Sequence, residues 1–211
     1  LGIIIGLIAA YSFNKFSEVE LPMALSFFSG KRLVPIMTVF FSTILAVILL
    51  FIWPMVFSGI VAFGEWLVGF GSFGAFLYGV FNRLLIPTGL HHALNAVFWF
   101  DTAGINDIGK FQTGVDAVKG ITGRYQAGFF PIMMFGIPAA ALAMYHSAET
   151  KQQKQVWGWF LASAISAFVV GVTEPIEFAF MFVAPVLFII HALLTGLSLL
   201  IASLFHWTAG F

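Results

Sequence analysis

Long apolar runs separated by short polar segments make up most of the sequence, and the longest of them runs from Val156 to Phe211. The only Asp, Glu, Lys or Arg side chains in this run are Glu174 and Glu177. An ionisable side chain at bilayer depth costs on the order of 3 kcal/mol, so such residues usually face a polar cavity and have a function there. The pattern therefore predicts membrane-embedded helices with two carboxylates at a polar site.

Pro175 marks the start of a helix inside this run. Proline has no N–H and clashes with the preceding turn, so it suits the first helical position better than the interior. The spacing predicts Glu174 as the N-cap and Glu177 as the third helical residue, where its carboxylate reaches back to the N–H of the cap. Because a helix end at membrane depth is tolerated only where it is buried in protein or lines an aqueous cavity, we expect a re-entrant or broken helix with Glu174 at its tip.

The segment Asn82–Asn95 predicts a second element of this kind. Pro87 and Gly89 interrupt its apolar pattern, and it is too short and too polar for an ordinary crossing. Its polar side chains are Asn82, Arg83, His91, His92 and Asn95.

Several other apolar runs are long enough to cross a bilayer as helices, at roughly 20 residues each. Leu1–Phe13 is expected to be the end of one span, and Leu33–Trp53 to be a full span that ends at Pro54. Two prolines and a glycine predict a kink within Gln126–Tyr145. The remaining expected spans are Val61–Phe81, Val156–Val172 and Phe178–Phe205.

Polar segments connect these runs. Leu21–Arg32 mixes apolar residues with a terminal basic pair, which predicts a segment in the membrane interface. That basic pair and the two lysines of Ser147–Gln155 favour the cytoplasmic side. Asp101–Arg124 is expected to be the one long extramembrane loop, and the side on which it lies is left open.

Composition agrees with this pattern. The chain is 61% hydrophobic and 9% charged, with a mean hydropathy of +1.03, whereas soluble domains carry about 25% charged residues. Since no sustained period-two alternation is present, we predict an all-α polytopic membrane protein and not a barrel. The formal net charge of zero argues against general affinity for nucleic acid. Without cysteine, a disulfide, a thiolate metal site and a cysteine nucleophile are excluded within this chain. Both ends are abrupt, so we expect a fragment of a longer membrane protein.

Four segments resemble the IIC membrane component of the bacterial sugar phosphotransferase system, in its glucose superfamily. They are Leu21–Pro35, Phe81–His92, Gly128–Pro138 and Gly171–Phe178. They occur in the order of that family, so the resemblance covers essentially the whole chain. Ile86–Leu90 and Phe129–Pro131 are most similar to the N-acetylglucosamine permeases.

The resemblance implies a fold, a reaction and partners. IIC proteins bind a hexose in the bacterial inner membrane, and a cytosolic IIB domain transfers a phosphoryl group from a phosphocysteine to the sugar 6-hydroxyl. The resemblance also implies a homodimer in which each protomer has a scaffold part and a transport part. By this resemblance, residues 1–81 are the trailing part of the scaffold without its leading helices, and residues 82–211 are the transport part, with helical hairpins near 82–100 and 165–185. The resemblance implies N-acetylglucosamine or glucose as substrate and neither a cofactor nor a metal. Because the cysteine domain is absent, the chain would act as one part of a phosphotransferase.

The resemblance also implies site residues. Glu174 matches the sugar-binding glutamate of the family, and His91 and Arg83 match its substrate-site histidine and arginine. Thr173 and Asn82 are expected beside them. Glu174 or His91 would take the hydroxyl proton as general base, and which of them does so is left open. The residues expected to support this site without contacting the sugar are His92, Glu177 and Gly89.

Other roles are open for several of these residues. Glu174 could be a helix cap without a substrate, and Arg83 could extend to the membrane interface. For Glu177 we favour the capping role. Adjacent helical residues point about 100° apart, so we expect only one of His91 and His92 to face the site, and favour His91. Three further histidines are interpreted as interface or packing residues: His146, His191 and His206.

Two other functions remain for the chain as a whole. A proton-coupled secondary sugar transporter could use Glu174 and His91, since carboxylates and imidazoles in membranes also form proton relays. A purely structural membrane subunit is the other alternative.

Overall fold

The computed structural model of the protein describes residues 2–100, 104–148 and 155–210. Helices are the only regular secondary structure in these ranges, which confirms the all-α fold class. Three helical segments are long and apolar enough to cross a membrane: Gly30–Val68, Arg124–Ser147 and Pro185–Leu204. The chain divides into two compact units, Leu1–Ser58 and Gly59–Phe211, which are described separately.

The first unit is a helical hairpin. Helix α1 (Gly2–Phe16) is followed by two short 3₁₀ helices, η1 (Met23–Phe28) and η2 (Gly30–Arg32), and then by α2 (Leu33–Val68), whose first part belongs to this unit. Phe41 of α2 contacts Tyr11 of α1, with ring centroids 6.1 Å apart. The segment Leu21–Arg32 is therefore irregular and 3₁₀-helical, and its position in the membrane interface stays a prediction.

Helix α2 does not end where the sequence analysis places its end. Pro54 lies inside the helix, which continues to Val68, so the prediction that a span ends at Trp53 is wrong. A proline in an apolar membrane helix removes a single backbone hydrogen bond and is tolerated when neighbouring groups compensate. The next helix, α3 (Ser72–Leu85), begins after the turn Gly69–Gly71, so the span predicted for Val61–Phe81 is also divided.

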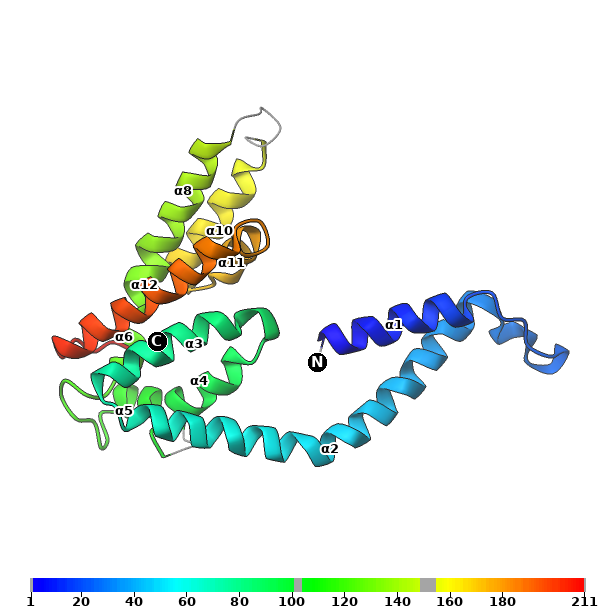
Figure 1. Ribbon diagram of the computed structural model, residues 1–211, viewed down its shortest axis with the longest axis horizontal. Coiled ribbons are helices and arrows are strands. Elements are labelled where there is room, and N and C mark those ends of the chain that lie inside the picture. Colours follow the sequence, from blue (N-terminus) through cyan, green and yellow to red (C-terminus); the bar gives the residue numbers. More distant parts are fainter. Residues whose placement is uncertain (1, 101–103, 149–154, 211) are drawn as a thin grey trace. The chain divides into compact units, whose positions relative to one another are not determined.

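The second unit contains the end of α2 and the remaining helices (Figure 1). After α3 come the 3₁₀ helix η3 (Ile86–Thr88) and α4 (His91–Trp99), so the chain breaks at Pro87 and Gly89 as predicted. Helix α5 (Asp107–Thr113) lies within the predicted extramembrane loop. The structure shows the break between α3 and α4. That this segment is a re-entrant element in the membrane remains a prediction.

Helices α3 and α12 (Pro185–Leu204) run side by side through this unit (Figure 1). Gly79 and Gly196 face each other at the contact, and a Cβ on Gly196 would lie 2.7 Å from the backbone oxygen of Phe76. Small residues allow membrane helices to approach closely in this way. The main apolar core combines residues of α2, α3, α4 and α12 with others from the segment 125–133, and Leu67, Tyr78 and Phe98 are fully buried in it.

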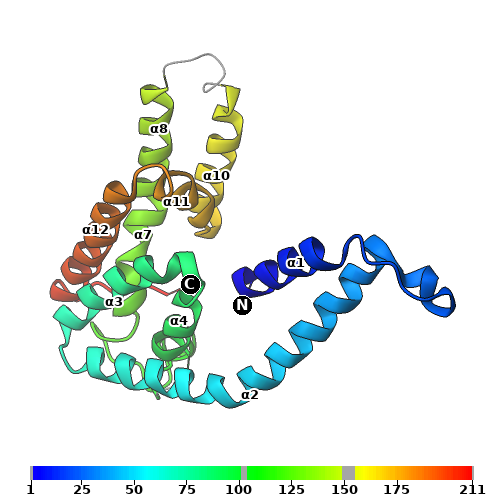
Figure 2. The same cartoon turned by 45° about the vertical axis from the view of Figure 1, so that its right-hand side comes forward.

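The segment that follows the loop is not one regular helix. It consists of α6 (Arg124–Ala127), α7 (Phe129–Pro131), a π-helical stretch η5 (Ile132–Gly136) and α8 (Ile137–Ser147). A stretch of π-helix is a known source of helix bending, and the kink predicted from the prolines in this segment stays a prediction. Helix α8 packs beside α10 (Trp157–Val170), as both views of the fold show (Figure 2). The predicted loop Ser147–Gln155 lies largely outside the described residues.

A short helix and a long one replace the single span predicted for Phe178–Phe205. Helix α11 (Glu174–Met181) ends early, and α12 starts at Pro185. Pro185 has no N–H and forces the preceding Ala184 out of the helical region, which explains why the chain breaks here. The helix break before Glu174 occurs where it was predicted.

The division into two compact units does not show which residues are scaffold and which are transport part. The boundary between the units falls between Ser58 and Gly59, whereas the sequence analysis places the functional boundary after residue 81. The assignment of 1–81 and 82–211 to these two roles stays a prediction.

Candidate functional site

A cavity of about 250 Å³ lies where the two predicted helix breaks meet, and its volume suits one small ligand. Residues from both breaks and from the segment after the loop line it. They are Asn82, Arg83, Ile86, His91, His92, Asn95, Trp99, Phe129, Met133, Val170, Gly171, Val172, Thr173 and Glu174. All five residues predicted to bind substrate are in this set.

Two glycines shape the backbone at this cavity. Gly89 ends η3 with φ 73°, and Gly171 ends α10 with φ 82°. Both values lie in the left-handed region, which glycine adopts without steric cost. These turns allow α4 and α11 to begin at the cavity, so the first residues of both helices face it. Gly89 is not among the described residues that line the cavity, and its supporting role stays a prediction.

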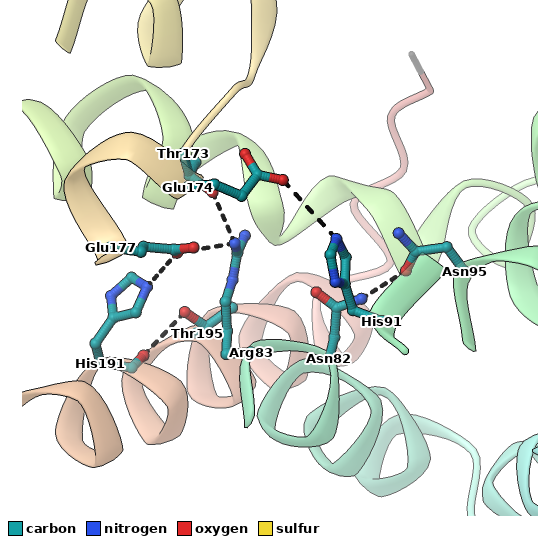
Figure 3. A network of polar contacts seen from close by, with 9 residues as sticks. All are labelled: Asn82, Arg83, His91, Asn95, Thr173, Glu174, Glu177, His191 and Thr195. Atoms are coloured by element: carbon teal, nitrogen blue, oxygen red, sulfur yellow. Dashed lines mark hydrogen bonds and ion pairs between the residues drawn. The ribbon is translucent and has the colours of Figure 1, made fainter. Parts of the chain in front are cut away.

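Glu174 and His91 face each other across the cavity (Figure 3). Glu174 Oε1 lies 3.8 Å from His91 Nε2, which exceeds the range of a hydrogen bond. The Glu174 side chain is 35% exposed, whereas that of His91 is 9% exposed. The carboxylate lines the cavity and therefore keeps its capacity to accept hydrogen bonds from a ligand.

His92 also borders the cavity, although its side chain is more exposed than that of His91. The two imidazole rings lie with their centroids 3.9 Å apart. The expectation that one histidine alone faces the site is therefore wrong, because the cavity extends over the first turn of α4. The separate roles given to the two histidines remain a prediction.

Arg83 is held inside the protein and does not extend to an interface. The residue is 5% exposed, and its Nη1 donates to Thr173 Oγ1 and to Glu177 Oε1, both at 2.9 Å. Its guanidinium carbon also lies 4.9 Å from the ring centre of Phe129. The alternative that Arg83 extends to the interface is thus wrong, because its charge is paired within the fold.

Glu177 does not form the predicted capping box. Helix α11 starts one residue earlier than expected, with Thr173 at the N-cap position and without a side-chain cap hydrogen bond. The Glu177 side chain is fully buried, and its Oε1 instead contacts Arg83 Nη1 at 2.9 Å and His191 Nε2 at 2.7 Å (Figure 3). The sequence analysis missed this pairing because it looked for a partner within the same helix.

His191 has a defined partner that the sequence analysis did not assign. It lies on the apolar helix α12, where an ionisable side chain is a signal for function, and the same argument that identified Glu174 applies to it. The interpretation of His191 as a simple packing residue is therefore incomplete.

Asn95 lines the cavity but is not among the predicted site residues. Its Oδ1 accepts a hydrogen bond from Tyr78 Oη at 2.8 Å and another from Asn82 Nδ2. Asn95 lies four residues after His91, which places both on one face of α4, and this spacing was a usable signal.

No group of three or more His, Asp or Glu side chains within the described ranges is placed to hold a metal ion. The cavity combines one accepting carboxylate with imidazole, amide and hydroxyl groups, and aromatic rings form part of its wall. Such a set can orient a neutral molecule with several hydroxyl groups.

The chain is similar in sequence to known proteins of one family. The sequence model of the family "Phosphotransferase system, EIIC" matches residues 1–196. The chain is 50% identical to the N-acetylglucosamine-specific EIICB component of the PTS system of Bacillus subtilis (strain 168), over 100% of this chain and 46% of that protein. It is 49% identical to the N-acetylglucosamine-specific EIICBA component of Escherichia coli (strain K12), over 100% of this chain and 33% of that protein.

A glucose-specific relative is almost as similar. The chain is 46% identical to the glucose-specific EIICBA component of Staphylococcus saprophyticus subsp. saprophyticus, over 100% of this chain and 33% of that protein. The chain thus spans less than half the length of each of these three relatives.

Proposed function

Because the chain belongs to the phosphotransferase system EIIC family, we propose that it binds a hexose and carries it across the membrane as the sugar is phosphorylated. The substrate is N-acetylglucosamine or glucose, in line with the sugars named for its relatives. The observation that carries the proposal is the convergence of Glu174, His91 and Arg83, from two separate helix breaks, on one small cavity.

The lining groups suit a neutral sugar. The Glu174 carboxylate accepts hydrogen bonds from sugar hydroxyls, and His91 and Asn95 offer donors on the opposite side. The rings of Trp99 and Phe129 add an apolar wall for the non-polar face of the sugar. Because Arg83 is neutralised by Glu177, the cavity carries little net positive charge, which favours an uncharged ligand over an anionic one.

Phosphoryl transfer requires positioning of the 6-hydroxyl and removal of its proton. Glu174 and His91 are the groups at the cavity that can accept this proton. The phosphoryl group comes from the phosphocysteine of a IIB domain, in line with the EIICB and EIICBA composition of the relatives. The chain therefore acts with that domain as a protein-phosphocysteine–sugar phosphotransferase, in the bacterial inner membrane and as a multi-pass homodimer.

Uptake into vesicles tests this function. In membrane vesicles that contain the full-length protein, uptake should require the phosphoryl-donor chain and yield sugar 6-phosphate. Uptake that continues without the donor and stops with an uncoupler would instead support the proton-coupled transporter, which the 3.8 Å approach of Glu174 and His91 also fits.

A further inference from the structure

His191 connects helix α12 to the wall of the sugar cavity. Its Nε2 lies 2.7 Å from Oε1 of Glu177, and its side chain is 15% exposed. Among the described residues that line the sugar cavity, neither His191 nor Glu177 appears. Any influence of His191 on the sugar is therefore indirect, and its polar contact toward the cavity is with Glu177.

The hydrogen in this contact can be assigned from the partners. Arginine remains protonated in proteins, and Arg83 lies 2.9 Å from the same Glu177 oxygen. Beside this cation the carboxylate is ionised and accepts hydrogen bonds only. His191 Nε2 is therefore the donor.

One oxygen of the Glu177 carboxylate accepts both hydrogen bonds. Oε1 of Glu177 takes the hydrogen bonds of Arg83 and His191, whereas the buried Oε2 has no hydrogen-bond partner within the described residues. Arg83 Nη1 in turn also donates to Thr173 Oγ1 at 2.9 Å. The contacts form a chain from α12 through α11 to α3, and it ends at two cavity residues, Arg83 and Thr173 (Figure 3).

We infer that His191 is a positioning residue of the sugar site, which fixes the Glu177 carboxylate and through it the guanidinium of Arg83. The inference rests on the proposed function and adds to it a residue that does not touch the sugar. A carboxylate held by Arg83 alone is free to rotate about its terminal bond, and the direction of the Arg83 donors changes with it. The His191 donor removes this freedom, so the cavity presents Arg83 in one geometry before the sugar arrives.

The same ring also packs against aromatic neighbours, and this offers a simpler role. The centroid of His191 lies 5.7 Å from that of Phe180 and 6.4 Å from that of Phe188. Two substitutions separate the roles: His191→Phe keeps an aromatic ring and removes the donor, whereas His191→Gln keeps a side-chain N–H and removes the ring.

Calorimetric titration of the full-length protein in detergent with N-acetylglucosamine, and separately with glucose, provides the test. We expect His191→Phe to weaken binding of the better sugar at least tenfold and His191→Gln to stay within threefold of wild type. A second cavity, separate from the sugar cavity, is lined by residues of α8, α10, α11 and α12, and His191 and Leu194 both border it. Leu194→Ala is therefore the matched control and should leave affinity within twofold of wild type. Wild-type affinity in His191→Phe with loss of affinity in His191→Gln would overturn the inference in favour of packing.

A double-mutant cycle adds a readout that packing alone does not change. If His191 acts through Glu177, then His191→Phe should weaken binding less than twofold further in a Glu177→Gln background. Fully additive losses would contradict the inference. Failure of wild type to bind either sugar would overturn the proposed function together with the inference, whereas sugar binding that is equal in wild type, His191→Phe and His191→Gln would overturn the inference alone.

Discussion

Glu174 Oε1 and His91 Nε2 lie 3.8 Å apart across one cavity, although they belong to different helices that both begin at a chain break. The two groups do not form a hydrogen bond with each other, because this distance exceeds that of a hydrogen bond. Both therefore remain able to bond to a ligand. A sugar hydroxyl that enters the cavity therefore finds an acceptor and an imidazole on opposite sides.

The imidazole of His91 is expected to act in proton removal. Imidazole is the side chain that most often serves as a general base, and His91 Nε2 faces Glu174 at the cavity. His91→Gln keeps a polar side chain but accepts no proton, so kcat for sugar 6-phosphate formation should fall about 100-fold or more, with a smaller change in KM.

His92→Gln is the matched control for this prediction, because His92 borders the same cavity on the adjacent position. Steady-state phosphorylation in membranes with an excess of phosphoryl donor measures both variants. Equal losses of kcat in the two variants would contradict a specific role for His91.

The pair of Arg83 and Glu177 is expected to dominate the stability of the second unit. Both side chains are buried, so Glu177→Leu leaves the guanidinium without a counter-charge and should cost about 3–5 kcal/mol. The double variant Arg83→Met, Glu177→Leu should recover most of this loss, because an apolar pair replaces the ion pair. Thermal unfolding in detergent measures the difference, and a double variant less stable than Glu177→Leu would refute the explanation.

Much of this site was predictable from the sequence, because ionisable residues are rare in apolar runs. Glu174 was identified in this way, whereas the site roles of Arg83 and His91 were implied by the resemblance to IIC proteins. The cavity contains all three. The partner of Glu177 was not predictable from spacing, since the hydrogen bonds to Arg83 and His191 depend on how α3, α11 and α12 pack.

The helix boundaries were less predictable for a related reason. Proline ends a helix in water more reliably than in an apolar environment, so Pro54 was taken as a stop although α2 continues through it. Pro185 does begin a helix, and the sequence offered no local feature that distinguishes it from Pro54. Tertiary packing decides between these outcomes.

The contact between α3 and α12 is expected to tolerate no larger residue at Gly196. A methyl group there would lie 2.7 Å from the backbone oxygen of Phe76, so Gly196→Ala should lower stability by about 1–3 kcal/mol. Gly158→Ala is the control, because no atom lies within 4 Å of the added methyl group and alanine favours a helix by up to about 1 kcal/mol. The unfolding midpoints of the two variants should move in opposite directions; a shared direction would argue against close packing at Gly196.

Asp107, in the segment outside the predicted spans, is expected to make stability depend on pH. Burial raises the pKa of Asp107, although the backbone N–H of Gly123 donates to its Oδ1 at 2.7 Å. The folded state therefore holds the proton more tightly than the unfolded state, where the pKa is about 3.9. The resulting stabilisation is complete below that pH and is lost as pH rises through the raised pKa.

Asp107→Asn removes this titration while keeping an oxygen that accepts from Gly123. The unfolding midpoint of wild type relative to Asp107→Asn should decrease as pH rises from about 4 and become constant above the raised pKa. A difference that grows with pH would show that the folded state favours the charged carboxylate instead.

Sugar binding by Glu174→Gln, measured by calorimetry on the full-length protein, tests the central claim most directly. Hydrogen bonds to a charged group contribute about 1.5–3 kcal/mol, so affinity should fall roughly 10- to 100-fold while the unfolding midpoint of the sugar-free protein stays the same. Glu65→Gln serves as the control, since this exposed glutamate on α2 does not line the cavity and should bind sugar like wild type. Undiminished affinity in Glu174→Gln would contradict the account.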